Sequence, residues 1–280
     1  MIRPLTADDV ARAQEITHSA LSVLDARMAR PVQDLTDEIV MRSKARAEHL
    51  HGTDPDRAFV AEVDGAAVGL AMALVREGMW FLSALMVAPA FQSQHVGRQL
   101  LDAALATATD RAWILTTDDA RAVRTYQRAG FELHPTFTAH GVADRSRIPV
   151  VQGIRDYAGD RETLDQVTRK VRGAAMGPEV DYFLMQGNRI LVVPDKGFVI
   201  LRPVGATWLA ATDEQTARSL LWAALAESTA PTLEIDWLSG DQQWAIDVCF
   251  DAGLSLRAGA PIALRGQQRM APYIPCGAFG

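Results

Sequence analysis

The sequence contains an internal repeat, and this feature limits the folds that the chain can adopt. Residues 97–106 read G-R-Q-L-L-D-A-A-L-A and residues 217–226 read A-R-S-L-L-W-A-A-L-A, with seven of ten positions identical. Residues 122–133 and 245–256 form a second pair, with four of twelve positions identical at an offset of 123 residues rather than 120. Helices rich in Leu and Ala often match by chance. Two pairs in the same order at nearly equal offsets nevertheless favour a duplicated unit.

Hydrophobic periodicity predicts strands and helices around both copies. In the first half, the expected strands cover residues 2–5, 58–63, 67–75, 79–87, 113–116 and 131–137, and the expected helices cover 7–24, 33–48, 97–109 and 119–129. The dipeptide Asp64-Gly65 predicts a tight hairpin. In the second half, we expect helices at 162–175, 213–227 and 241–252, and strands at 189–193, 198–202, 207–211, 232–237 and the end of the chain.

These elements predict an α+β protein of the α/β sandwich type. The pattern weakens from about residue 138 to 165, so we expect a domain boundary near residue 150. The resulting domains cover residues 1–150 and 151–280, and each should hold a mixed central sheet with flanking helices.

Composition narrows the class of protein. Hydrophobic residues make up 49% of the 280 residues, which is enough for real cores. A net charge of −6, with neither sign in a long block, argues against a nucleic-acid partner. Cys249 and Cys276 are too few for a disulfide framework and indicate a reducing compartment. Because no apolar run approaches the roughly 18 residues of a membrane span, we expect a cytoplasmic protein without a membrane partner.

Residues 87–101 carry the most specific chemical pattern of the first half. They read V-A-P-A-F-Q-S-Q-H-V-G-R-Q-L-L, an apolar strand end, a polar loop and the start of a helix. Such a helix start presents backbone N–H groups at the positive end of the helix dipole, where phosphate binds. Gly97 would let a pyrophosphate approach the backbone, and Arg98 could add an ionic contact. The alternative is that Gly97 only lets the helix and the strand pack closely.

Four stretches together resemble the GCN5-related N-acetyltransferase (GNAT) family, here as a tandem pair with a degenerate C-terminal domain. They are I-R-P-L-T-A-D-D at the start, the Asp64-Gly65 hairpin with the following A-A-V-G-L-A, the block V-A-P-A-F-Q-S-Q-H-V-G-R, and D-A-R-A-V-R-T-Y-Q-R-A-G-F. The phosphate loop of the family reads Q/R-x-x-G-x-G/A, and Gln92, His95 and Gly97 fill its fixed positions. The sequence departs from this motif at the first glycine, where it has His95. We expect the His95 backbone to stay in the right-handed region, with the side chain pointing outward.

The resemblance implies acetyl-CoA as a co-substrate and no metal. It assigns the binding of acetyl-CoA to the following residues: Leu85, Met86 and Val87 beside the pantetheine arm, Gln92, Ser93, Gln94, His95, Val96, Gly97 and Arg98 around the pyrophosphate, and Asp119 at the next helix start. Asp119 is also a candidate helix cap.

The resemblance further implies that Tyr126 protonates the leaving thiolate. The alternative is a buried tyrosine with a bonded hydroxyl. Ser83 occupies the position where many members carry a glutamate base, and it could orient a water molecule. Other candidate bases are Glu77, Asp118, His18 and Asp25, and substrate selection is expected from His18, Asp25, Arg27 and Met28 in the first two helices.

The second half lacks the corresponding chemical groups. Residues 212–217 read T-D-E-Q-T-A, with two carboxylates and no glycine, and Cys249 stands in the place of Tyr126. We therefore predict that this domain does not bind coenzyme A, and that it completes a substrate cleft or forms an oligomer interface, such as that of a homodimer. In some tandem members the end of the chain enters the active site. Tyr273, Phe279 and the Gly280 carboxylate are therefore candidates for lining the pocket, with plain structural docking as the alternative.

The sequence thus favours an acetyl-CoA-dependent N-acetyltransferase, in which an amine of a small molecule attacks the thioester directly. Two alternatives stay open: a sensor that binds coenzyme A without turnover, and another thioester chemistry on the same fold. The acceptor could be a small amine, an aminoglycoside-like antibiotic, an amino acid or a protein lysine. Small molecules are preferred because the second domain should narrow the cleft.

Overall fold

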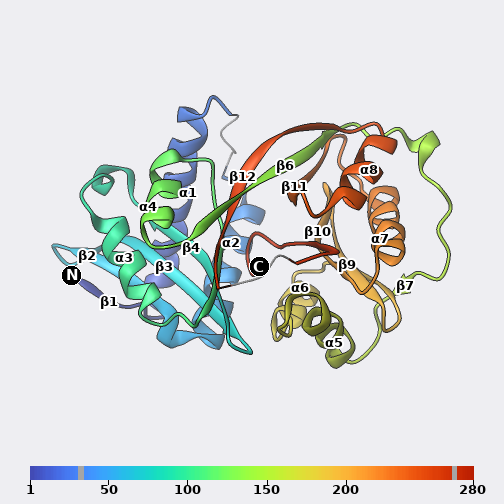
Figure 1. Cartoon of the computed structure of the whole chain (residues 1–280). Coiled ribbons are helices and arrows are strands. Elements are labelled where there is room, and N and C mark those ends of the chain that lie inside the picture. Colours follow the sequence, from blue (N-terminus) through green and yellow to red (C-terminus); the bar gives the residue numbers. More distant parts are fainter. Residues whose placement is uncertain (31–34, 267–269) are drawn as a thin grey trace. The chain divides into compact units, whose positions relative to one another are not determined.

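The structure is a computed structural model that describes residues 1–30, 35–266 and 270–280 (Figure 1). The contacts within the chain define two compact units. Unit 1 comprises Met1–Val75, Trp80–Ala112 and Phe279, and unit 2 comprises Arg76–Met79, Trp113–Ala278 and Gly280. These units do not follow the sequence repeat, so the domain boundary near residue 150 stays a prediction.

Unit 1 is built on the strand order β1 (Ile2–Pro4), β2 (Ala58–Val63), β3 (Ala66–Arg76) and β4 (Met79–Val87). Its helices are α1 (Asp9–Arg27), α2 (Asp37–Thr53) and α3 (Val96–Leu105), with the short turns η1 (Pro55–Arg57) and η2 (Pro89–Phe91). Asp64 and Gly65 have φ values of 50° and 79°, so the expected tight hairpin between β2 and β3 is confirmed. The first two residues of the helix expected at 33–48 lie outside the described residues.

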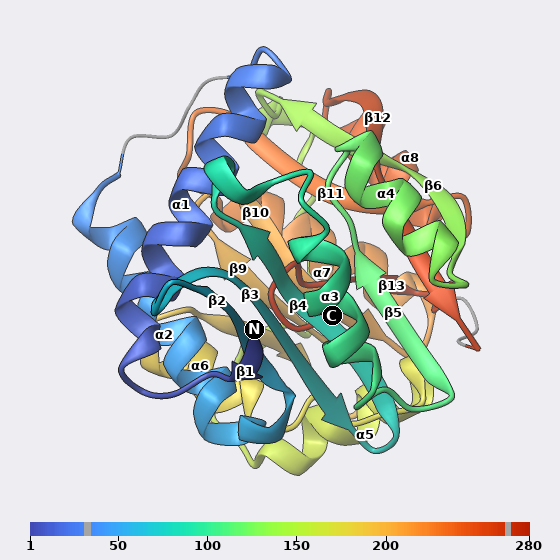
Figure 2. The ribbon, with the colours of Figure 1, turned by 90° about the vertical axis from the view of Figure 1, so that its left-hand side faces the viewer.

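Helix α3 lies against the strands of unit 1 (Figure 2). A glycine of β3 allows this close approach. A Cβ atom added to Gly69 of β3 would lie 2.9 Å from Leu100 Cδ1 and 3.0 Å from the Met86 carbonyl oxygen. Real side chains do not tolerate such contacts without a shift of the neighbouring atoms. Gly69 therefore lets Leu100 reach the sheet, and this contact fixes the start of α3 near the end of β4.

Unit 2 contains two groups of paired strands. One has the order β5 (Arg111–Leu115, from Trp113 onward), β12 (Ser255–Arg265), β6 (Glu132–Gly141) and β11 (Leu233–Ser239). The other has the order β13 (Tyr273–Ile274), β10 (Gly205–Ala211), β9 (Gly197–Arg202), β8 (Ile190–Val193) and β7 (Arg155–Asp156). The remaining elements are α4 (Ala120–Arg128), η3 (Arg145–Arg147), α5 (Arg161–Arg172), α6 (Glu179–Met185), α7 (Glu214–Glu227) and α8 (Gln243–Asp251).

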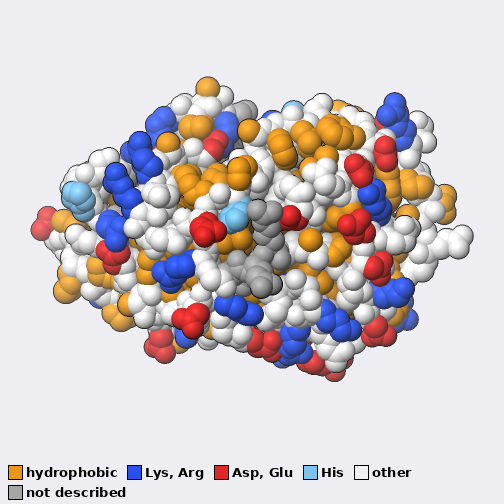
Figure 3. Space-filling model, viewed as in Figure 1, with side chains coloured by type: hydrophobic (Ala, Val, Ile, Leu, Met, Phe, Trp, Pro, Cys, Tyr) orange, Lys and Arg blue, Asp and Glu red, His pale blue; other side chains and the backbone are white. Residues whose placement is uncertain are grey.

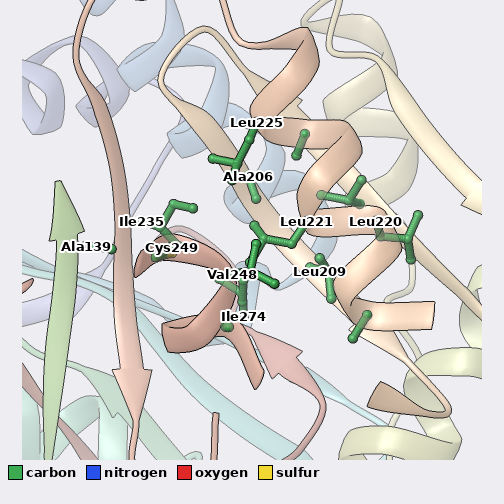
Figure 4. Packing of buried hydrophobic residues seen from close by; sticks show 14 of the residues in the cluster. Ala139, Ala206, Leu209, Leu220, Leu221, Leu225, Ile235, Val248, Cys249 and Ile274 are labelled. Atoms are coloured by element: carbon green, nitrogen blue, oxygen red, sulfur yellow. The ribbon is translucent and has the colours of Figure 1, made fainter. Parts of the chain in front are cut away.

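The core of unit 2 lies between α7, α8 and strands of both groups (Figure 4). Leu221 from α7 and Val248 from α8 meet Leu209 from β10 and Ile235 from β11 within one buried cluster. Burial of a large aliphatic side chain contributes about 1.5–3 kcal/mol. The two helices of the second repeat are therefore held by this cluster.

The duplication expected from the sequence is supported by a matching packing detail. A Cβ atom on Gly197 of β9 would lie 2.8 Å from Leu220 Cδ1 and 2.9 Å from the Ala210 carbonyl oxygen. Gly69 has the same two kinds of neighbour in Leu100 and Met86. Leu100 and Leu220 are also the leucines that the sequence repeat aligns. The expected α+β fold class, with sheets and flanking helices, is confirmed.

Charged side chains of both signs lie interspersed on the face that Figure 3 shows. Among the residues that the structure describes, no helix has the length and apolar character that crossing a membrane requires.

Candidate functional site

The loop of residues 88–95 joins β4 to α3 and is held by two glutamines. The Gln92 side-chain amide donates to the Val87 carbonyl oxygen (3.0 Å), and the Gln94 side-chain amide donates to the Ala90 carbonyl oxygen (2.9 Å). The Ala88 N–H donates to the Val68 carbonyl oxygen (2.8 Å). The loop is therefore pinned to the end of the strand and braced from within.

His95 corrects one expectation. Its φ is +63°, in the left-handed region, and Ser93 has a φ of +62°, so the expected right-handed backbone at His95 is wrong. The family glycine at this position can adopt the left-handed conformation easily, and this chain keeps that conformation although it carries a histidine. The side chain is exposed and does not cap α3, which agrees with the outward orientation that we expected.

Gly97 has no evident structural requirement of its own. A Cβ atom there would meet only Val87 Cγ2, at 3.6 Å, which is an ordinary van der Waals distance. Gly97 does not have a positive φ either, because it is a helical residue in the first turn of α3. Close packing therefore does not require a glycine at this position, and the role of Gly97 beside a ligand stays a prediction.

Arg98 is exposed beside the same helix start. Its guanidinium Nε donates to Asp102 at 2.9 Å and 3.0 Å, and the two side chains are 46% and 53% exposed. Such i,i+4 pairs contribute only about 0.3–0.5 kcal/mol. Arg98 can therefore turn toward a phosphate at little cost.

Strand β4 becomes more open toward the loop. Ser83 is buried within the strand, whereas Leu85, Met86 and Val87 are half-buried. The Val87 carbonyl already accepts the Gln92 amide, so one of its two lone pairs has a partner in the loop. The backbone role of these three residues beside a ligand stays a prediction.

Tyr126 and Asp119 lie on α4 in unit 2. Asp119 caps the helix, since its Oδ1 accepts the Arg121 N–H (3.0 Å), and its carboxylate also pairs with the Arg121 guanidinium. Burial, followed by the charge of Asp119, raises the pKa of Tyr126 above its ordinary value. Within the described part of the chain, its hydroxyl has no hydrogen-bond partner. The phenol is thus kept protonated, as a proton donor must be, and the alternative of a bonded core tyrosine is not supported.

The candidate bases are spread over both units and are mostly engaged. Arg169 donates to Glu77 (2.8 Å), and this bond is the main cause that holds the pKa of Glu77 below its ordinary range. Asp25 pairs with Arg30 (3.1 Å), and His18 lies 3.5 Å from the Ser22 hydroxyl within α1.

The remaining candidates for acceptor binding and catalysis lie at or near the ends of helices. Arg27 ends α1, Met28 is exposed beyond it, and Asp118 precedes α4. The roles of these residues stay predictions.

The corresponding region of the second repeat is closed. Only Thr212 and Asp213 separate β10 from α7, against the eight residues of the loop before α3. The Asp213 carboxylate accepts the Thr216 N–H (2.8 Å), a bond that lowers the pKa of Asp213, so the helix start already holds an anion. Strand β13 pairs with β10 through Leu209 opposite Ile274 and Ala210 opposite Tyr273.

Cys249, at the position of Tyr126 in the repeat, lies in the core of unit 2 (Figure 4). Its burial raises the pKa of the thiol to about 12, so it stays a neutral, inert group. In the second repeat a packing residue therefore stands at the position of Tyr126.

The end of the described chain is held by polar contacts. The Tyr273 hydroxyl accepts a hydrogen bond from Trp208 Nε1 (2.7 Å) and donates one to the Gly280 carbonyl oxygen (2.8 Å). The Phe279 ring meets the His49 ring in unit 1, with 5.4 Å between their centroids. The expected role of Tyr273, Phe279 and Gly280 in an active site stays a prediction.

Among the described residues, no cluster of three His, Cys, Asp or Glu suits a metal ion.

In unit 1, β4 leads through the loop of residues 88–95 into α3, whose start has no side-chain cap and carries Gly97 in its first turn. Residues 23–131 match the family model of the acetyltransferase (GNAT) family. Residues 23–131 therefore resemble an acyltransferase domain of this family. No protein with a curated function matches the sequence.

Solved structures extend this likeness of fold over the whole chain. A proposed acetyltransferase from Pyrococcus horikoshii has a TM-score of 0.79 at 17% identity, and the match covers 100% of this chain and 95% of that protein. Eis1 from Mycobacterium abscessus has a TM-score of 0.58 at 16% identity, covering 95% and 73% of the two chains. A GCN5-related N-acetyltransferase from Sphaerobacter thermophilus has a TM-score of 0.54 at 13% identity, with 96% of both chains covered. At these identities the likeness concerns the fold alone.

Proposed function

We propose that the protein is an acetyl-CoA-dependent N-acetyltransferase that acts on an amine of a small molecule. The observation that carries this proposal is Gly97, a glycine at the uncapped start of α3 that neither packing nor backbone conformation requires. Pyrophosphate binding to the helix start gives that glycine a physical reason. The left-handed conformations at Ser93 and His95 give the loop the shape that glycines otherwise provide.

In this reaction the amine nitrogen forms a bond to the thioester carbonyl carbon, and the carbon–sulfur bond breaks. Tyr126 donates its phenolic proton to the departing sulfur, a role supported by a hydroxyl that has no hydrogen-bond partner among the described residues. Ser83 is our candidate for orienting the water molecule that removes the amine proton. The amides and Arg98 at the start of α3 hold the pyrophosphate.

A Gly97→Ala variant tests the phosphate loop. The added methyl group has room against Val87, so we expect normal folding together with at least about tenfold weaker binding of coenzyme A, measured by titration calorimetry. Gly52→Ala in α2 is the matched control, because a Cβ atom there meets nothing within 4 Å and the residue lies outside the loop. Unchanged affinity in Gly97→Ala would remove the assigned role of this glycine.

Release of free thiol from acetyl-CoA, measured with a panel of small amines, tests the chemistry. Thiol release together with an acetylated amine supports the proposal. Binding of coenzyme A without thiol release for any amine would support the sensor, and thiol release without an acylated amine would support another thioester chemistry.

The second repeat, in this proposal, does not bind coenzyme A. Its short connection, the Asp213 carboxylate at the start of α7 and the pairing of β13 with β10 support this view. Its role in a substrate cleft or a homodimer interface, and a cytoplasmic location of the protein, stay sequence-based predictions.

A further inference from the structure

Unit 2 contains a cavity of about 310 Å³ that none of the residues assigned to the phosphate loop lines. Its walls come from β5, β6, β11, β12 and the chain around β13, and they are largely aromatic and aliphatic. Trp113 and Tyr273 are almost fully buried and lie next to each other, with 6.4 Å between ring centroids. Phe137, which is 42% exposed, and the partly exposed Trp237 also line it.

Two irregularities in strand pairing border this cavity on either side of β6. Asp236 and Trp237 of β11 interrupt the register between Ile235 opposite Ala139 and Leu238 opposite Phe137. The Thr138 hydroxyl donates to Asp236 Oδ1 (2.6 Å) and pins this bulge. On the other edge, the register with β12 shifts between Gly259 and Ile262. Bulges re-aim side chains and are often found beside functional sites.

Trp237 is held in a strained conformation at the first bulge. Its φ is +55°, in the left-handed region that a bulky side chain rarely adopts, at a cost of order 1–3 kcal/mol. Gly277 packs against its ring so closely that a Cβ atom would lie 2.6 Å from Trp237 Cη2. The structure thus fixes the indole as a wall of the cavity at a cost in free energy, and a binding role would explain that cost.

Another part of the lining is held by a buried glutamine. Gln242 is 3% exposed, and its Oε1 accepts Trp244 Nε1 (2.8 Å) and the Tyr273 N–H (3.1 Å), while its Nε2 donates to the Met270 carbonyl oxygen. Every polar atom of this side chain therefore has a partner. Met270 and Tyr273 are positioned before any ligand arrives, which lowers the entropic cost of binding.

The charge of the lining selects the kind of ligand. Asp241 contributes a carboxylate and His134 an imidazole, and the described lining residues include neither lysine nor arginine. The faces of Trp and Tyr rings attract cations. An anionic ligand would find no cationic partner among these residues. A ligand that carries both a flat ring and a positive group would suit the aromatic walls and the carboxylate.

We propose that this cavity binds a small aromatic amine. A role of this amine as the acetyl acceptor rests on the proposed acetyl transfer. Binding of the amine to the cavity does not rest on that proposal, because binding can be measured in the absence of acetyl-CoA. A molecule of this chemistry could be an acceptor or a ligand that binds without reacting.

The probe is 2-phenylethylamine, titrated into the full chain while the tryptophan fluorescence is followed. We expect saturable binding of 2-phenylethylamine. Two comparison compounds should each bind at least about tenfold more weakly: 3-phenylpropionate, which has a similar size but the opposite charge, and butylamine, which lacks the ring. Phe137→Ala should weaken binding about two- to tenfold, the usual range for one aromatic contact. Phe250→Ala is the matched control, because Phe250 is also exposed (52%) but does not line the cavity.

The outcomes separate this site from the proposed reaction. Absence of saturable binding, equal binding of the carboxylate, or equal effects of the two Phe variants would overturn the site. When acetyl-CoA is added, detection of N-acetyl-2-phenylethylamine by mass spectrometry, sensitive to Phe137→Ala, identifies the amine as an acceptor. Selective binding without that product supports the site as one for a non-reacting ligand and leaves the acetyltransferase proposal to the wider amine panel.

Discussion

His95 keeps the backbone conformation of a glycine and carries the cost of a side chain there. Its φ of +63° disfavours a residue with a Cβ atom by about 1–2 kcal/mol. We therefore expect His95→Gly to relieve this strain. Because glycine also has a larger entropy in the unfolded chain, which opposes folding, the net rise in the free energy of unfolding should be at most about 1 kcal/mol. Denaturant titration measures this change.

Gln94→Gly provides the comparison for His95→Gly. Gln94 has no positive φ, and its side chain braces the loop, so this replacement should lower stability. Equal losses of stability in the two variants would contradict the strain at His95.

Tyr126 is the second residue whose environment predicts an experimental result. We expect Tyr126→Phe to lower turnover by about 10²- to 10⁴-fold, since that is the usual contribution of positioned proton transfer. Folding should be unaffected, because the hydroxyl has no hydrogen-bond partner in the described part of the chain. Turnover equal to that of the wild type would remove the acid role.

The pH dependence of the same variant follows from the direction of the pKa shift. Burial raises the pKa of Tyr126, so the phenol stays protonated at and above the pH where an ordinary tyrosine begins to ionise. The ratio of wild-type to Tyr126→Phe turnover should therefore be constant between about pH 6 and pH 9. A ratio that falls toward one as the pH approaches 9 would show that Tyr126 ionises in this range and would contradict the raised pKa.

At the scale of elements, the two repeats depend on the same contact between a helix and a strand. Gly69→Ala and Gly197→Ala each place a methyl group within 3.0 Å of a leucine side chain and a backbone carbonyl. We expect each variant to lose about 1–3 kcal/mol of stability, the usual cost of overpacking a core. Gly52→Ala should instead be neutral or stabilising, because alanine favours the helix and has room there.

The outcome for this glycine pair also tests the duplication. Similar losses in both variants, with partial recovery when Leu100→Ala or Leu220→Ala is added, are expected if the contacts are equivalent. Loss in one variant alone would show that the two glycines have different roles.

Most of the longer elements could be predicted from the sequence, because their apolar residues follow the helical or strand period over enough positions. β2, β3 and β4 were expected at nearly their observed bounds, and Asp64-Gly65 indicated the hairpin between the first two. α6 has only seven residues, and β7 and β13 have two each, too few for a period to be visible. β6 continues to Gly141 because its last residues pair with β11 and β12, which are distant in sequence.

The phosphate loop could be proposed from the sequence because its residues are consecutive. The left-handed conformation of His95 could not, because a residue other than glycine gives no signal for it. The cavity of unit 2 was missed for another reason. Trp113, Phe137, Trp237 and Tyr273 come from four separate strands. In addition, bulges in β11 and β12, which both line the cavity, break the two-residue alternation.

At the scale of the whole molecule, the two repeats diverge at the same structural point. In the first repeat, eight residues and a helix start without a side-chain cap follow β4. In the second, two residues follow β10 and Asp213 caps α7. A carboxylate there satisfies the helix dipole that a phosphate would otherwise stabilise, and it repels a second anion. The cap therefore strengthens α7 and disfavours a second anion at its start.

This divergence predicts one coenzyme A per chain. Titration calorimetry of the full chain should give a stoichiometry of about one, because the backbone edge of β10 is already paired with β13 and the start of α7 is already capped. Gly97→Glu, which places a charged side chain at the first site, should abolish binding. Asp213→Ala should lower stability by about 1 kcal/mol, the usual cost of losing a cap, and leave the stoichiometry unchanged. A stoichiometry near two, or half of the binding left in Gly97→Glu, would show that the second repeat still binds the coenzyme.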